Sequence, residues 1–184
     1  MADGVQGLLL AAGEGRRMGM PKALVRDDDG TSWLRRSLAV LRDGGCDEIT
    51  VVLGAGAAEA RLLLDGSVRT VIARDWAEGM GASLRSGLRS LDETDAALVS
   101  LVDLPDVGPD VVRRLLRLDA DPAALARATY AGAPGHPVLL GRDHWPGVVE
   151  SAVGDRGARD YLDGHDVLFV ECGDLAIGAD RDTR

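Results

Sequence analysis

Three short segments of the sequence carry residues that could bind phosphate groups and a divalent metal ion. The first is a glycine-rich stretch, LAAGEGRRMGMPK, which ends at Lys22. The second holds Asp103 directly after an apolar run, and the third holds Asp180 and Asp182 near the end of the chain. Backbone N–H groups and ammonium groups bind anions, and carboxylates are the ligands that Mg²⁺ takes in proteins. These residue types therefore suit chemistry on anionic substrates.

The glycine-rich stretch is longer and more basic than an ordinary turn. Its glycines let backbone N–H groups approach an anion closely, and its cations surround the same concavity. These residues are Gly13, Gly15, Gly19, Arg16, Arg17 and Lys22. A Rossmann dinucleotide loop is disfavoured, because the GxGxxG spacing fails and Met20-Pro21 opposes a helix there. A P-loop lacks its GK[ST] here, and a structural turn would not need the ten residues from Gly13 to Lys22.

Composition singles out Lys22. It is the only lysine among the 21 Lys and Arg residues, so arginine occupies every other basic position. A compact ammonium and a planar guanidinium are not equivalent beside a phosphate. We therefore interpret Lys22 as a point charge that takes part in the chemistry.

Each group of aspartates admits two interpretations at this level. Asp103 follows a buried strand, where a carboxylate is costly to desolvate without a partner, so it either binds Mg²⁺ or caps the turn that begins near residue 104. Asp180 and Asp182 either bind an ion or belong to a solvated acidic tail, which is the usual state of a chain end.

Alternating strands and helices must position these segments. Apolar runs of strand length occur at residues 5–10, 49–53, 68–73, 96–102 and 167–170. One helical pattern can be capped by Thr31 or Ser32 and ends at Gly44-Gly45. Others occur at residues 57–64, 81–91, 109–118, 145–153 and 156–162, with AGAPGHP as a loop. This alternation predicts a parallel α/β sheet, in which ligands bind beyond the carboxyl ends of the strands. All three segments fall at such ends.

Length and charge narrow the function classes. The 184 residues fit one domain, and the net charge of −9 argues against a general nucleic-acid binder. No apolar run approaches the ~20 residues that span a membrane, and MADGVQG lacks the basic start of a signal peptide, so we expect a cytoplasmic protein. Cys46 and Cys172 lack CxxC spacing and are expected to be reduced structural thiols.

A family resemblance is carried by six segments in order. LAAGEGRRMGMPK resembles the signature loop of the MobA-like nucleotidyltransferases, LAAG-x-[SG]-x-R-M-G-x-x-K. The other five are DWAEGMGASLRSGL, LVDLPDV, APGHPVLLGRDHW, GDRGARDYL and GDLAIGADRDT. Within the superfamily the chain resembles the molybdenum cofactor cytidylyltransferases most. The Ala-Ala-Gly start and the proline before Lys22 are typical of the CTP-using branch rather than the guanylyltransferase branch.

The resemblance implies a Rossmann-like three-layer α/β/α sandwich with a mostly parallel sheet, the nucleotide-diphospho-sugar transferase fold. It implies transfer of CMP from CTP to the phosphate of molybdopterin, with release of pyrophosphate and Mg²⁺ or Mn²⁺ as cofactor. A molybdoenzyme or its chaperone is a candidate partner, and no nucleic acid or membrane is involved. One domain would span 1–184, with a nucleotide-binding half at about 1–120 and an acceptor-binding half at about 121–184 that supplies the C-terminal metal ligand.

The resemblance also implies residue roles. The catalytic residues would be Lys22, Arg17 and Asp103. The nucleotide would be bound by Leu10, Ala11, Ala12, Gly13, Gly15, Arg16, Arg17, Lys22 and Ser83. The acceptor would be bound by His136, Arg156 and Arg159. The metal would be bound by Asp103 and by one of Asp180 and Asp182.

Other expectations stay open. His136 otherwise makes a structural hydrogen bond, and Arg156 and Arg159 otherwise form surface pairs with Asp155 and Asp160. Members of the family usually continue past Asp-x-Asp-Thr with Pro-Glu-Asp and a closing helix, so the metal-binding end is expected to be less well anchored here. Rival functions are a nucleotidyltransferase using GTP or another acceptor, such as a sugar phosphate or phospholactate, and a non-catalytic nucleotide-binding or maturation protein. Fold and loop alone do not decide among them.

Overall fold

A seven-stranded sheet forms the centre of the computed structural model, which describes residues 4–91 and 93–183. Its strands are β1 (Val5–Ala11), β2 (Ile49–Leu53), β3 (Arg69–Ile72), β4 (Ala96–Leu101), β5 (Leu125–Tyr130), β6 (Ala133–Gly141) and β7 (Leu168–Glu171). Their spatial order is β3-β2-β1-β4-β6-β5-β7. Strand β6 is antiparallel to both of its neighbours, and the other described pairings are parallel. The α/β sheet predicted from the alternation is confirmed, and it is mostly parallel, as the family resemblance implies.

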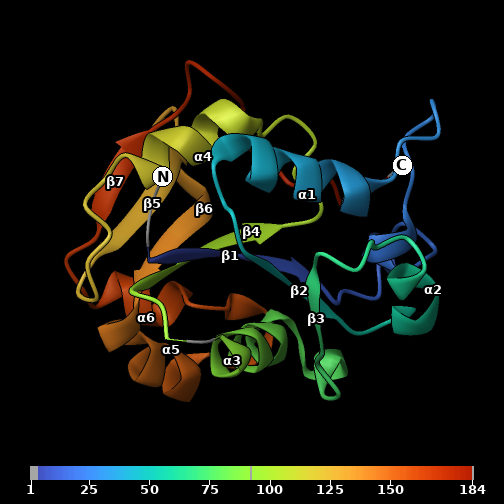
Figure 1. Ribbon diagram of the computed structural model, residues 1–184, viewed down its shortest axis with the longest axis horizontal. Helices are drawn as coiled ribbons and strands as arrows, with labels where there is room; N and C mark the ends of the chain where they lie inside the picture. The colour runs from blue at the N-terminus through green and yellow to red at the C-terminus, as the bar shows by residue number, and fades with distance from the viewer. Residues whose placement is uncertain (1–3, 92, 184) are drawn as a thin grey trace.

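Helices cover both faces of the sheet, as Figure 1 shows, and make the three-layer sandwich. Helices α1 (Trp33–Gly44) and α4 (Pro109–Leu116) lie on one face. Helices α3 (Met80–Ser90), α5 (Trp145–Ser151) and α6 (Arg159–Asp163) lie on the other, while α2 (Ala57–Arg61) lies beside the sheet. Short 3₁₀ turns are η1 (Lys22–Leu24), η2 (Trp76–Glu78), η3 (Arg142–His144) and η4 (Gly154–Arg156).

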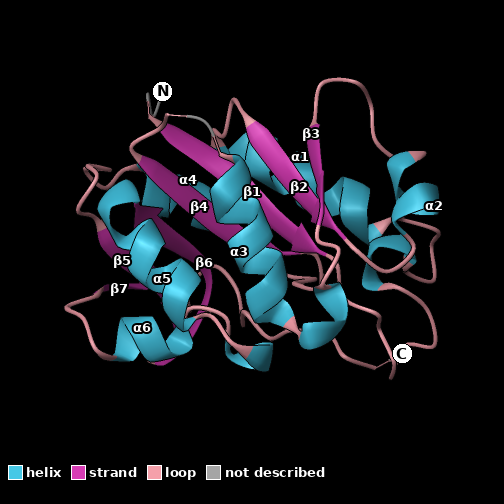
Figure 2. Cartoon of the chain, turned by 90° about the horizontal axis from the view of Figure 1, so that it is seen from below, coloured by secondary structure: helices cyan, strands magenta, loops and turns pink. Residues whose placement is uncertain are grey.

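Burial on both faces explains the continuous apolar run of β1. Leu9 and Ala11 pack into the core beneath α1 and α4, whereas Leu8 and Leu10 pack into the core beneath α3 and α5. A central strand with helices on both sides reads as an unbroken apolar stretch. Figure 2 shows the strands from below, with the C-terminal segment at the end toward which the arrowhead of β1 points.

Local signals explain the boundaries of α1. The hydroxyl of Ser32 accepts a hydrogen bond from the backbone N–H of Arg35, so Ser32 is the N-cap. Gly45 adopts a left-handed conformation and ends the helix. Leu34, Leu38 and Leu41, which repeat at helical spacing, are buried as the pattern predicts.

The sequence analysis did not predict the strands β5 and β6, and it interpreted AGAPGHP as a loop. This segment instead begins β6, and its His136–Pro137 peptide bond is cis. Pairing with β4 and β5 holds the segment extended, although its register against β5 shifts beside Pro134. His136 therefore lies within a strand, and the expectation that it lies in a strand-end loop is wrong.

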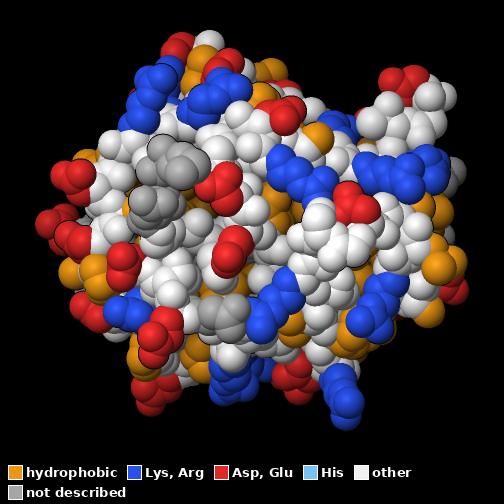
Figure 3. Space-filling model, in the orientation of Figure 1, with side chains coloured by type: hydrophobic (Ala, Val, Ile, Leu, Met, Phe, Trp, Pro, Cys, Tyr) orange, Lys and Arg blue, Asp and Glu red, His pale blue; other side chains and the backbone are white. Residues whose placement is uncertain are grey.

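The surface of the protein carries charges of both signs. On the face seen in Figures 1 and 3, acidic side chains lie along the margin near β7, and basic ones are more frequent over the opposite half. Cys46 and Cys172 are free and buried, as expected. No helix among residues 4–91 and 93–183 is long and apolar enough to cross a membrane.

Candidate active site

A cavity of about 530 Å³ opens at the carboxyl ends of β1 and β4. Its walls come from the loop after β1, from η2 and the start of α3, from the end of β4, from η4 and from the C-terminal segment. The predicted site residues that line it are Leu10, Ala12, Gly13, Gly15, Arg16, Arg17, Lys22, Ser83, Asp103, Asp180 and Asp182. The fold thus brings the three chemical segments of the sequence to one place.

Lys22 lies between two carboxylates that are distant in sequence. Its Nζ donates to Oδ2 of Asp103 at 2.5 Å and to Oδ1 of Asp182 at 2.7 Å. Arg17 approaches the other oxygen of Asp182 at 3.6 Å. The side chain of Asp103 is 8% exposed and that of Lys22 is 20% exposed, whereas Asp182 is 43% exposed. The buried aspartate after β4 is therefore paired with an ammonium, as its burial requires.

The loop geometry explains why glycine and proline precede Lys22. The backbone N–H of Lys22 donates to the carbonyl of Gly13 at 3.1 Å, so the loop folds back on itself. Gly15 has φ +63°, and a Cβ there would lie 2.0 Å from the carbonyl oxygen of Met20. Pro21 precedes the 3₁₀ turn that Lys22 begins. This closed loop turns the lysine toward β4.

Electrostatics keep the lysine charged. Burial opposes the charge of Lys22, but Asp103 and Asp182 outweigh that effect and raise its pKa above the ordinary value. Burial raises the pKa of Asp103, and the ion pair with Lys22 offsets part of that rise. The hydrogen bond and charge of Lys22 lower the pKa of Asp182. An ammonium between carboxylates is therefore the stable arrangement of these groups.

The same aspartates form a group that could hold a metal ion. One carboxylate oxygen from each of Asp103, Asp180 and Asp182 lies within 4.8 Å of the others. Three carboxylates offer the oxygen ligands that Mg²⁺ and Mn²⁺ prefer. Asp182 accepts a hydrogen bond from Lys22, whereas Asp180 is exposed to solvent. A metal ion would therefore compete with the Lys22 ammonium for Asp182, but only with solvent for Asp180.

The C-terminal segment is tied down, contrary to the weak anchoring expected. Asp106 accepts hydrogen bonds from the backbone N–H groups of Ile177 at 2.6 Å and Gly178 at 3.2 Å. The backbone N–H of Arg181 donates to the carbonyl of Asp103 at 2.8 Å. The Arg181 guanidinium also lies 3.4 Å from Asp27. These contacts place Asp180 and Asp182 beside Asp103.

Four predicted residues do not line the cavity. Ala11 is buried in the core on the α1 side of the sheet. His136 is half-buried in β6, and burial beside Arg127 lowers its pKa to about 4. Nε of Arg156 lies 2.8 and 2.9 Å from the two carboxylate oxygens of Asp160, and a terminal amino group of Arg156 donates to the same carboxylate. Arg159 is the first residue of α6. The roles of His136, Arg156 and Arg159 in binding the acceptor stay predictions, as does the role of Ala11 in binding the nucleotide.

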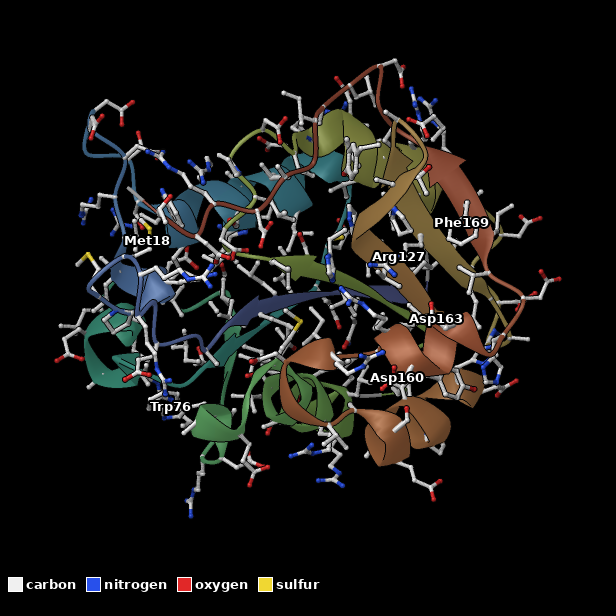
Figure 4. All side chains as sticks on the ribbon, turned by 180° about the vertical axis from the view of Figure 1, so that it is seen from behind. Met18, Trp76, Arg127, Asp160, Asp163 and Phe169 are labelled. Atoms are coloured by element: carbon white, nitrogen blue, oxygen red, sulfur yellow. The ribbon has the colours of Figure 1, made fainter. Side chains whose placement is uncertain are left out.

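The cavity also contains residues that the sequence analysis did not assign to it. Trp76 on η2 lines the cavity; Figure 4 labels it. Met80 lines the same wall at the start of α3. Asp155 on η4 also lines the cavity beside Gly79, where an added Cβ would lie 2.5 Å from its Oδ1, and it acts electrostatically on Arg16. The signal for Trp76 was its closeness in sequence to Ser83, while nothing local distinguished Asp155 from neighbouring surface aspartates.

Comparison with known proteins adds sequence relatives. A profile of the MobA-like NTP transferase domain matches residues 7–168. Nicotine blue oxidoreductase from Paenarthrobacter nicotinovorans is 35% identical over 97% of this chain and 92% of its own length. A probable molybdenum cofactor guanylyltransferase from Mycobacterium avium (strain 104) is 31% identical over 92% of this chain and 87% of its own.

Solved structures share the whole architecture. Rv0371c from Mycobacterium tuberculosis H37Rv superposes with a TM-score of 0.83 and 27% identity, covering 100% of this chain and 95% of its own. Its complex with manganese superposes with a TM-score of 0.79 and 26% identity, covering 98% and 95%.

Proposed function

The chain belongs to the MobA-like NTP transferase family and is an enzyme of the nucleotidyltransferase class, and from that premise we propose that it transfers CMP from CTP to the phosphate of a molybdopterin-type acceptor. Pyrophosphate is the second product. The proposal includes a cytoplasmic location and delivery of the product to a molybdoenzyme or its chaperone.

One observation carries the proposal: the only lysine of the chain is held by two aspartates at the wall of a cavity under a glycine-rich loop. Transfer of a nucleotidyl group requires that several phosphate charges be neutralised and that the reacting groups be held in line. Backbone N–H groups at Gly13 and Gly15, with the cations of Arg17 and Lys22, suit a triphosphate.

The acidic group fits Mg²⁺ or Mn²⁺, because Asp103, Asp180 and Asp182 bring carboxylate oxygens within 4.8 Å of one another. A related protein was solved in complex with manganese. When bound, the ion would neutralise phosphate charge and orient the phosphate oxygens. Asp103 and one or both of the C-terminal aspartates would hold it.

The protein's own residues then act by position and charge. A phosphate oxygen of the acceptor attacks the α-phosphorus of CTP, and the bond from that phosphorus to the bridging oxygen breaks. A new phosphoanhydride forms and pyrophosphate leaves with the bonding electron pair. Lys22 and Arg17 stabilise the negative charge that develops on the transferred and leaving groups, so no nucleophile from the protein is needed.

The proposal that CTP is the nucleotide donor rests on the sequence of the glycine-rich loop. Ala11-Ala12 and Pro21 resemble the CTP-using branch, whereas a relative named as a probable guanylyltransferase keeps GTP as a competing donor. We propose to measure pyrophosphate release with each of the four nucleoside triphosphates, molybdopterin and Mg²⁺. We expect release with CTP that requires both the acceptor and the metal. Preference for GTP would overturn the cytidylyl assignment.

A redox activity is the second candidate, because the relative with 35% identity bears the name of an oxidoreductase. The discriminating assay is reduction of nicotine blue with NADH or NADPH, with and without the cavity variant Lys22→Met. Reduction by the wild-type protein without pyrophosphate release in any nucleotide assay would favour this candidate over nucleotidyl transfer.

A further inference from the structure

Asp27 lies outside the cavity, and its carboxylate accepts hydrogen bonds from three side chains. Its Oδ1 accepts from Nε1 of Trp33 at 2.8 Å and from Nη1 of Arg181 at 3.4 Å. Its Oδ2 accepts from Nη1 of Arg36 at 2.5 Å. Because Trp33 and Arg36 belong to α1, Asp27 joins the first turn of that helix to the C-terminal segment.

The turn before α1 holds Asp27 in a fixed place. Its backbone N–H donates to the carbonyl of Thr31 at 2.9 Å, and its carbonyl accepts from the backbone N–H of Gly30 at 2.8 Å. Trp33, whose indole binds the carboxylate, is 1% exposed. A side chain whose own contacts lock it in place can hold another residue precisely. Asp27 is therefore a rigid point to which the C-terminal segment attaches.

Arg181 connects this rigid point with the acidic group of the cavity. Its backbone N–H donates to the carbonyl of Asp103 at 2.8 Å, while its guanidinium reaches Asp27 at 3.4 Å. Asp180 and Asp182, on either side of Arg181, line the cavity. Figure 4 shows the C-terminal segment, in red, running past α4 and α1 toward the loop before α1. The side chains of this segment thus alternate between the cavity and Asp27.

We propose that Asp27 is a positioning residue for the metal site: by holding Arg181, it keeps Asp180 and Asp182 turned toward Asp103. The inference rests on the proposed function for the metal ion that these carboxylates hold. Residues near a chain end are ordinarily mobile unless other contacts tie them down. Holding the carboxylates in place before the ion arrives lowers the ordering cost of binding, so the anchor increases metal affinity without touching the metal.

Calorimetric titration with Mn²⁺ alone tests the anchor without turnover. Asp27→Ala should weaken Mn²⁺ binding about tenfold, the lower end of the effect of residues that orient metal ligands, because Arg181 is 41% exposed. Arg181→Ala should have the same effect. The double variant should also bind about tenfold more weakly than the wild type, since either change breaks the same link. A loss of about a hundredfold in the double variant would show independent effects and overturn the proposal.

Stability distinguishes positioning from general structural support. Asp27→Ala leaves Trp33 and Arg36 without their acceptor, so its melting temperature should fall, whereas Arg181→Ala retains both of those bonds. Equal losses of Mn²⁺ affinity in two variants of unequal stability cannot arise from stability. Without metal, the backbone amides of Asp180 and Asp182 should become more mobile on the ps–ns timescale in both variants, as measured by ¹⁵N NMR relaxation. Arg181→Lys keeps the charge and should recover most of the affinity.

Asp65→Ala is the matched control. Asp65 also pairs with an arginine of α1, because it lies 3.3 Å from Arg42, and it accepts a hydrogen bond from the backbone of Ser67. This pair lies outside the cavity and outside the C-terminal segment. Asp65→Ala should therefore leave the Mn²⁺ affinity unchanged. An equal loss in Asp65→Ala would overturn the specific role of Asp27.

The outcomes separate the two proposals. Weaker Mn²⁺ binding in both Asp27→Ala and Arg181→Ala, without nucleotidyl transfer by the wild-type protein, would refute the proposed function and leave the anchor standing. Transfer by the wild type, with the Mn²⁺ affinity unchanged in both variants, would refute the anchor and leave the proposed function standing. A wild-type protein that does not bind Mn²⁺ would also refute the anchor.

Discussion

Replacement of Lys22 by methionine tests the centre of the site. The change removes an ammonium from between Asp103 and Asp182 while keeping a side chain of similar length. Asp103 is left buried without its cation, and the loss of one partner from a buried pair costs about 3–5 kcal/mol. Because Lys22 is 20% exposed and Asp182 is 43% exposed, water and the second carboxylate relieve part of this cost. We expect a loss of about 2 kcal/mol in the free energy of unfolding, toward the upper end of single-mutant effects.

Two measurements follow from that magnitude. For a chain of this size, about 2 kcal/mol corresponds to a fall in Tm of about 4–8 °C, measured by calorimetry without metal. Saturating Mg²⁺ or Mn²⁺ should restore much of the Tm, because a cation that binds the folded state takes the place of the lost ammonium. The activity should stay low, by about 10²–10³ in kcat, because the removed charge acts on the transition state.

Lys22→Arg is the matched control. It keeps the positive charge and should keep the Tm, but its planar fork cannot replace a compact ammonium between two carboxylates and a phosphate. We therefore expect lower activity without a comparable loss of stability. Activity of Lys22→Met within tenfold of the wild type, in protein shown to be folded by circular dichroism, would refute the assigned role of Lys22.

The other predictions concern the loop, the C-terminal segment and β7. Gly15→Ala should lower the free energy of unfolding by more than about 1–2 kcal/mol, because it adds a collision with Met20 to the cost of positive φ; Gly19→Ala, with φ +75° and nothing within 4 Å, should cost only about that amount in the same urea titration. Arg181→Ala should weaken Mn²⁺ binding about tenfold in a calorimetric titration, because it removes the guanidinium that anchors the proposed metal-binding segment to Asp27. Backbone N–H groups and a threonine hydroxyl hold the pKa of Glu171 below its ordinary value, so its stabilisation is present above about pH 4.3 and lost as the pH falls through the lowered pKa. The Tm difference between wild type and Glu171→Gln should therefore vanish in acid; a difference that persists at pH 2 would contradict this reasoning.

Sequence patterns predicted most of the strands and helices before about residue 120. The run before Gly13 is apolar on both faces, and the leucines of α1 repeat at helical spacing. The apolar pattern and the capping residue were therefore enough to predict β1 and α1. The segment at Pro134 and Pro137 defeated the same approach, since local preference favours a loop. Its strand exists because β4 and β5 pair with it from both sides, and such pairing is not encoded within the segment.

The residue types of the site were determined by the sequence itself: a lone lysine after a glycine-rich loop and aspartates at strand ends. Only the tertiary structure decided which of them meet. Lys22 binds carboxylates 81 and 160 residues away in the sequence. The physical reason is that the parallel sheet brings strand ends together by register, while periodicity reports only on the few residues around each position.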